Sequence, residues 1–119
     1  MNGLALALDE LRALALSPKL VWRRFVQGVQ IHRLWGAADT RSGALLRYAP
    51  GSRSPRHRHE GTEHIYVLIG SQRDERGVYP AGSHVVNQPG STHVVSSPEG
   101  CVVFVVWERP NTFLDTEKA

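Results

Sequence analysis

The segment from Gly51 to Gly70, GSRSPRHRHEGTEHIYVLIG, places three of the six histidines of the chain within eight residues, His57 to His64. His57 and His59 are two positions apart, so on a β-strand both side chains lie on the same face. Metal ligands use this spacing. Glu63 follows Gly61, whose backbone freedom permits a tight reversal that can return the carboxylate to the histidine pair.

Beyond Glu63 the residues alternate as they do in a strand. The set predicted to face inward is Glu63, Ile65, Val67 and Ile69, and the opposite set is His64, Tyr66 and Leu68. A buried carboxylate is costly unless it is paired or bound to a metal, and two neighbouring imidazoles explain its retention. His93, which enters a strand after the glycine-containing turn QPGST, is the candidate for a fourth ligand.

Three imidazole nitrogens and one carboxylate oxygen suit a divalent transition metal. We therefore expect one such ion per chain, held by His57, His59, Glu63 and His93. Fe, Ni, Zn, Mn and Cu are all chemically compatible with this ligand set. The residue types do not select among them.

The rest of the chain predicts an antiparallel all-β sandwich or barrel. Short apolar or β-branched runs recur after Pro18 and are separated by turns rich in Gly, Pro, Asn and Asp, and we expect them at residues 26–35, 44–49, 64–69, 84–87, 93–96 and 101–107. The charged stretch SQRDERG, residues 71–77, is expected to be a solvated hairpin tip. Ahead of the strands, helical spacing predicts a short helix with an apolar stripe of Leu4, Leu8, Leu11 and Ala15.

Length and composition limit the possible functions. A chain of 119 residues is expected to form one domain: a helical segment at 1–20, a barrel at 21–110 and a tail at 111–119. The net charge of +3 is not clustered enough to predict nucleic-acid binding. No apolar run approaches the roughly 18 residues of a membrane span. The single cysteine, Cys101, excludes an intramolecular disulfide and is compatible with a cytoplasmic location.

The histidine segment also resembles the first motif of a known superfamily, the cupins. That motif, G(X)5HXH(X)3,4E(X)6G, fits at every position from Gly51 to Gly70. In the second motif, G(X)5PXG(X)2H(X)3N, Gly82, Gly90 and His93 stand at the right separations, whereas Gln88 replaces the proline and Ser97 the final asparagine. These departures affect turn geometry and leave the ligands in place.

Among cupins, the chain resembles small single-domain members similar to the C-terminal domain of ChrR-type anti-sigma factors. It also resembles dioxygenases that cleave hydroxylated acetophenones or diketones. The resemblance implies a double-stranded β-helix, or jelly-roll barrel, after the short N-terminal helix that the helical spacing predicts. It further implies a metal near the middle of the barrel and, commonly, a homodimer.

Two functions from different classes follow. The first is a mononuclear metal-dependent oxygenase acting on a small diketone or phenolic ketone, with Glu63 as both ligand and proton acceptor. Candidate pocket residues are Arg47, Tyr48, Phe104 and Trp107, and Arg53 and Arg56 are further candidates to pair with an anionic substrate. The alternative is a non-catalytic sensor that binds a small molecule and is related to the anti-sigma domains. A sugar epimerase or isomerase is a weaker third possibility.

Overall fold

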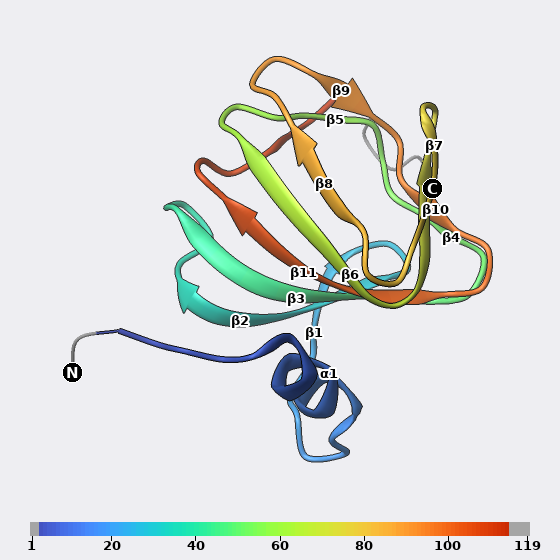
Figure 1. Ribbon diagram of the computed structural model, residues 1–119. Helices are drawn as coiled ribbons and strands as arrows, with labels where there is room; N and C mark the ends of the chain where they lie inside the picture. The colour runs from blue at the N-terminus through green and yellow to red at the C-terminus, as the bar shows by residue number, and fades with distance from the viewer. Residues whose placement is uncertain (1–2, 115–119) are drawn as a thin grey trace.

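The computed structural model describes residues 3–114 and consists mostly of β-strands (Figure 1). One helix precedes them, α1 (Leu8–Leu16). The strands are β1 (Arg23–Val26), β2 (Val29–Gly36), β3 (Ser42–Tyr48), β4 (Ser52–Arg53), β5 (His57–Arg58), β6 (Glu63–Asp74), β7 (Gly77–Pro80), β8 (His84–Asn87), β9 (Thr92–His93), β10 (Ser96–Ser97), β11 (Cys101–Trp107) and β12 (Thr112–Phe113).

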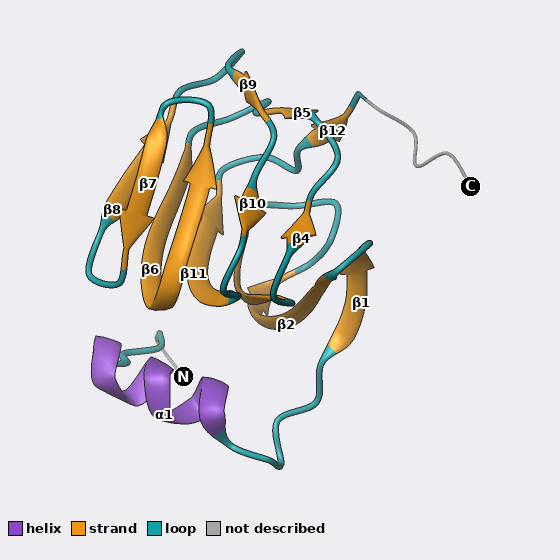
Figure 2. Cartoon of the chain, turned by 90° about the vertical axis from the view of Figure 1, so that its right-hand side faces the viewer, coloured by secondary structure: helices purple, strands orange, loops and turns teal. Residues whose placement is uncertain are grey.

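The strands form a large curled sheet and a small one. The large sheet has the order β1-β2-β3-β11-β6-β10-β4, with β7 and β8 also pairing with β6. The small sheet, β12-β5-β9, lies at one end of the curl, and α1 lies near the other end (Figure 2). All pairings are antiparallel. The predicted all-β jelly-roll barrel with an N-terminal helix is therefore confirmed.

Alternation along the strands separates two apolar clusters. The inner cluster fills the curl and includes Val29, Ile31, Ala44, Leu46, Ile65, Val67, Val103 and Val105. The outer cluster lies between the sheet and the helix, where Leu11 and Ala15 of α1 pack on Leu45, Leu68 and Val102. Leu4 and Leu8, which the helical stripe also included, are exposed. The helix thus covers part of the outer face and leaves the concave face free.

A β-bulge changes the inward-facing set of β6. Val103 pairs with Val67 but Val102 pairs with Ile69, so Leu68 is an extra residue in this strand. Leu68 and Ile69 consequently both belong to the outer cluster. The prediction that Ile69 faces inward is wrong because simple alternation does not include the bulge.

Two segments that were expected to lie outside the strands, the charged stretch 71–77 and the tail from residue 111, contribute residues to strands. β6 continues to Asp74, and although Glu75 and Arg76 form an exposed turn, Gln72 and Asp74 are buried. Thr112 and Phe113, in the expected tail, pair with Arg58 and His57 of β5. The domain boundaries at residues 20 and 110 stay predictions, and residues 115–119 of the expected tail lie outside the described residues.

Within residues 3–114, no helix is long and apolar enough to cross a membrane.

Candidate metal centre

Two histidines of one segment, His57 and His59, meet a third from a distant segment, His93, at the small sheet. His57 lies on β5 and pairs directly with His93 on β9. His59 follows β5, and its backbone N–H donates to the carbonyl of Ser91 at 2.9 Å. All three side chains are buried, and one ring nitrogen from each lies within 4.8 Å of the others. The structure therefore brings His57, His59 and His93 into one group that could hold a metal ion.

The outer ring nitrogen of each histidine is held by an oxygen acceptor. Nδ1 lies 3.0 Å from the Pro55 carbonyl in His57, 3.0 Å from the Ser91 carbonyl in His59, and 3.0 Å from Oδ2 of Asp74 in His93. An Nδ1–H that donates to these oxygens fixes the tautomer and leaves the Nε2 lone pair free. The three rings are thus oriented as metal ligands usually are.

Burial favours the neutral form of two of these rings, His57 and His93. Burial lowers the pKa of His57 to about 4, and it also lowers the pKa of His93. The Nε2 atoms of His57 and His93 are 2.9 Å apart, and Nε2 of His59 is buried beside them. Lone pairs held this close repel each other unless a cation lies among them. The donor set therefore fits a divalent metal.

Glu63, the first residue of β6, lies beside this group. Its Oε1 is 3.0 Å from Nε2 of His59 and accepts a hydrogen bond from Asn87 at 2.8 Å. Its Oε2 accepts hydrogen bonds from the Trp107 indole at 2.6 Å and from Asn111 at 3.1 Å. Burial alone would raise the pKa of Glu63, but the contacts with His59 and Asn111 lower it to about 2. The carboxylate is ionised, and donor atoms 3.0 Å apart can share one metal at bond lengths of about 2.0–2.2 Å.

Polar residues that sequence reasoning missed connect Glu63 with His93. Asp74 accepts from His93, and Arg76 donates to Oδ1 of Asn87 at 2.6 Å while lying 3.6 Å from Oδ2 of Asp74. Asp74 and Arg76 lie in the stretch that was predicted to be a solvated tip. The available signal was the alternation of Gln72 and Asp74, which is typical of a strand that continues with one buried face.

Of the four predicted pocket residues, the structure places two beside the histidines. Tyr48 and Trp107 line a small cavity of about 20 Å³, together with His57, Glu63 and His93. A space of this size holds about one water. Phe25, which stacks on Trp107, and Phe113, which contacts His57, also line this cavity.

Arg47 and Phe104 lie on the opposite face of the sheet. Arg47 stacks over Trp22 at 4.4 Å and donates to Gln30, whereas Phe104 packs on Tyr66. Their positions correct the expectation that they line the pocket. Arg47 lies between the inward-facing Leu46 and Tyr48 in sequence, and Phe104 lies between Val103 and Val105. The alternation of side chains along a strand therefore turns both residues outward.

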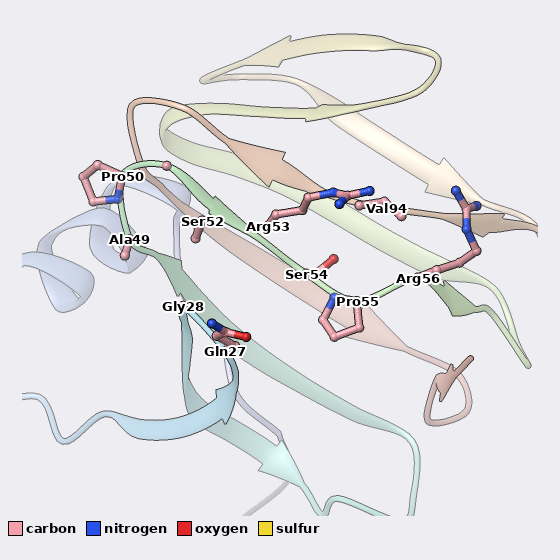
Figure 3. A pocket seen from close by; sticks show the side chains of 11 residues that line it. Gln27, Gly28, Ala49, Pro50, Ser52, Arg53, Ser54, Pro55, Arg56 and Val94 are labelled. Atoms are coloured by element: carbon pink, nitrogen blue, oxygen red, sulfur yellow. The ribbon is translucent and has the colours of Figure 1, made fainter. Parts of the chain in front are cut away.

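Arg53 and Arg56 border a separate, open groove of about 580 Å³. Figure 3 shows the segment from Ala49 to Arg56 running along this groove, with Gln27 and Gly28 on one side and Val94 on the other. Arg56 pairs with Glu75 at 3.0 Å. Ser54 lines both the groove and the histidine cavity, so the two spaces adjoin at this segment.

A curled antiparallel barrel with three converging, buried histidines defines a cupin-type metal-binding domain. The chain belongs to the family described as the ChrR Cupin-like domain, which matches residues 12–109. No curated protein matches the sequence.

Several solved structures share the fold. An RmlC-like cupin protein from Ralstonia eutropha is 25% identical, with 83% of this chain and 69% of that chain covered and a TM-score of 0.70. An acetylacetone dioxygenase from Acinetobacter johnsonii is 18% identical, with 84% and 75% covered and a TM-score of 0.73. The Rhodobacter sphaeroides complex of SigE with the anti-sigma ChrR gives 21% identity, 90% and 70% coverage and a TM-score of 0.68.

Proposed function

We propose that this protein is a mononuclear metal-dependent oxygenase that acts on a small enolisable substrate, either a diketone or a phenolic ketone. One observation carries the proposal: three buried histidines converge beside an ionised, buried carboxylate in a chamber with apolar walls. Such a chamber excludes bulk water and strengthens electrostatic interactions inside it.

Each residue has a role in this proposal. His57, His59 and His93 would hold the ion, and Glu63 would be a fourth ligand that also accepts a proton. A bound divalent metal supplies Lewis acidity toward a carbonyl or enol oxygen, and Fe(II) also supplies electrons for reaction with dioxygen. The hydrogen bonds from Asn87, Trp107 and Asn111 orient the Glu63 carboxylate toward the histidines. The aromatic rings of Phe25 and Phe113 would exclude water above it.

Metal analysis is the first test. We expect about one transition metal per chain in protein made in metal-replete medium, and a large loss of metal in His59→Ala and His93→Ala. His64→Ala is the matched control, because His64 stacks on His84 on the outer face. A wild-type protein that binds none of Fe, Ni, Zn, Mn or Cu would contradict the metal centre.

Oxygen uptake is the second test. The Fe(II)-loaded protein is expected to consume oxygen with acetylacetone or a hydroxyacetophenone, and Glu63→Gln is expected to slow this reaction. The choice of acetylacetone is supported by the fold shared with the acetylacetone dioxygenase. An absence of turnover across a panel of diketones and phenolic ketones would contradict the oxygenase proposal and favour the second candidate.

The second candidate is a sensor that binds a metabolite at the same centre and passes the signal to a protein partner. Membership of the ChrR Cupin-like domain family favours it. Tight binding of one small molecule without turnover, measured on the metal-loaded protein, would distinguish it from the enzyme.

We also propose a homodimer in the cytoplasm. The outer face leaves Val86 37% exposed beside the stacked rings of Tyr66, Phe104 and His84, which supports a contact between two copies. Sedimentation at several concentrations would show a monomer if the dimer does not form. Cys101 is a buried, free thiol whose pKa is raised by burial to about 11, which is compatible with a reducing compartment.

A further inference from the structure

A second cavity lies next to the histidine chamber and contains a cation on the inner face of β2. It has a volume of about 120 Å³, and its lining includes Phe25, Arg33, Ser42, Trp107, Asn111 and Phe113. Arg33 continues the inward-facing series of Val29 and Ile31. The chamber and this cavity share Phe25, Trp107, Asn111 and Phe113, so the two spaces adjoin along these side chains.

Arg33 has hydrogen-bonding capacity left for a ligand. Its Nη1 donates to Oγ of Ser42 at 2.8 Å, and its guanidinium carbon lies 5.9 Å from the Trp107 ring. Within residues 3–114, no carboxylate lies at ion-pair distance from Arg33, whereas Arg41 and Arg56 pair with Glu108 and Glu75. A partly buried cation without a counter-charge favours binding of an anion, above all one that matches the planar guanidinium.

Asn111 offers a second unused polar atom in the shared wall. Its Nδ2 donates to Glu63, whereas its Oδ1 is buried without a hydrogen-bond partner. Buried polar atoms in proteins are usually paired, so an unpaired acceptor bordering a cavity indicates a missing partner. A ligand hydroxyl or a water brought by the ligand would supply that partner.

The remaining walls are aromatic. Phe25 stacks on Trp107 with ring centroids 5.7 Å apart, and it contacts the edge of Phe113 at 5.9 Å. Flat rings of this kind pack well on a planar apolar ligand. A cation at one side and aromatic rings around it therefore select for a planar molecule that carries one negative group.

We propose that this cavity is the binding site for a small planar organic acid, with its carboxylate on Arg33 and its apolar body against Phe25, Trp107 and Phe113. The role of the bound acid rests on the proposed function, because the acid would lie next to the metal chamber and serve there as substrate or sensed ligand. It narrows the substrate class to ketones or phenols that also carry a carboxylate.

The test uses benzoate as the probe and benzamide as its neutral counterpart. Binding is measured by calorimetry and by fluorine NMR with the 4-fluoro derivatives, on both metal-loaded and chelator-treated protein. We expect benzoate to bind at least ten times more tightly than benzamide. Arg33→Gln is expected to weaken benzoate binding about 10- to 100-fold, which is the usual loss for a charged hydrogen bond, and to leave benzamide binding unchanged.

Arg47→Gln is the matched control, since Arg47 is also a partly exposed arginine but lies on the outer face of β3. It is expected to bind benzoate as the wild type does. Phe113→Ala provides an independent variant, because Phe113 is 38% exposed and its loss should not unfold the barrel. This change is expected to weaken benzoate and benzamide to a similar extent.

The outcomes separate this site from the metal centre. Failure of the wild type to bind benzoate, or equal binding by wild type and Arg33→Gln, would overturn the acid site. Benzoate binding that depends on Arg33 in a protein that takes up no metal would support the acid site and refute the proposed metal centre. Binding in both forms, with oxygen uptake only in the Fe(II)-loaded form, would support both proposals.

Discussion

Asp74 contacts a candidate ligand, His93, without belonging to the ligand group. Its Oδ2 lies 3.0 Å from Nδ1 of His93, and its Oδ1 accepts hydrogen bonds from Tyr79 and from the backbone of Arg76. A carboxylate in this position fixes the orientation of the imidazole and increases its basicity. Asp74 is therefore a positioning residue for His93.

We predict that Asp74→Asn weakens metal affinity by about 10- to 100-fold, the range typical for the loss of such a partner. The affinity is measured by competition with a chelator of known strength. Asp39→Asn, in the exposed turn between β2 and β3, is the control and is expected to leave the affinity unchanged. Equal affinities in the two variants would show that Asp74 has no effect on His93 as a ligand.

The neutral state of His57 has a consequence for the stability of the metal-free protein. Burial lowers the pKa of His57 to about 4, while an unfolded histidine titrates near 6.5. Between these values the unfolded chain binds the extra proton, so stability falls as the pH decreases from about 6.5 to 4. The loss attributable to His57 is on the order of 3 kcal/mol, since one pKa unit corresponds to about 1.36 kcal/mol.

Urea unfolding in the presence of a chelator, at a series of pH values, measures this loss. His57→Gln is expected to have a shallower dependence in the same pH range, because it removes the titrating group. A wild-type stability that stays constant or rises toward pH 4 would contradict the prediction.

Much of the candidate site could be predicted at the residue scale. The spacing of His57, His59 and Glu63 is local, because the two-residue step between the histidines and the reversal at Gly61 bring the three side chains together. Arg33, Asp74 and Asn111 were missed because their importance depends on contacts with distant strands. Arg33 did leave a local signal, a charge in the inward-facing series of β2, but only its hydrogen bond to Ser42 and its contact with the Trp107 ring show what it borders.

At the scale of elements, two glycines that begin and end the first motif differ in their surroundings. Gly51 and Gly70 both have positive φ, +79° and +75°. A Cβ added at Gly51 would meet no atom within 4 Å, whereas one at Gly70 would overlap the carbonyl oxygen of Gly100 in the turn before β11. Gly70 is thus needed both for its backbone conformation and for the close approach of two chain segments.

We predict that Gly51→Ala lowers the free energy of unfolding by about 1–2 kcal/mol, the usual cost of a left-handed alanine. Gly70→Ala is expected to cost about 3–5 kcal/mol, since the steric overlap adds to the same backbone cost. Chemical denaturation of both variants measures the difference. Equal losses would show that the turn before β11 moves aside without cost.

The long strands could be predicted from sequence and the short ones could not. β3, β6, β8 and β11 have apolar alternation or buried runs of four or more residues, which is a local signal. β4, β5, β9, β10 and β12 are two residues each, so they exist only because a partner strand is present. The bulges in β2 and β6 were missed for the same reason, because a bulge is defined by the register between two strands.

At the scale of the whole molecule, a metal would connect the small sheet to the large one. His57 and His93 belong to the small sheet, whereas Glu63 begins β6 of the large sheet. The small sheet has few residues and few hydrogen bonds of its own, so regions like it open at a lower free energy than a central strand. Metal binding should therefore raise the local stability of the small sheet more than that of the central strands.

We predict that removing the metal lowers hydrogen-exchange protection in β5, β9 and β12 and leaves β3 and β11 nearly unchanged. The melting temperature should also fall, because a ligand at 100 times its Kd contributes about 2.7 kcal/mol to stability. Exchange measured with and without a chelator tests this prediction, and His59→Ala is expected to resemble the chelated wild type. A uniform loss of protection across all strands would contradict it.

One row of paired residues crosses the large sheet at the level of the histidines. Ser42 pairs with Trp107, Trp107 with Glu63, and Glu63 with Asn87. Because side chains alternate between faces, inserting one residue between Val103 and Trp107 would turn the indole outward and deprive Glu63 of its shortest hydrogen bond. Related sequences can therefore differ in the composition of β11 far more readily than in its length. Insertions in them are expected in the turns and not within this strand.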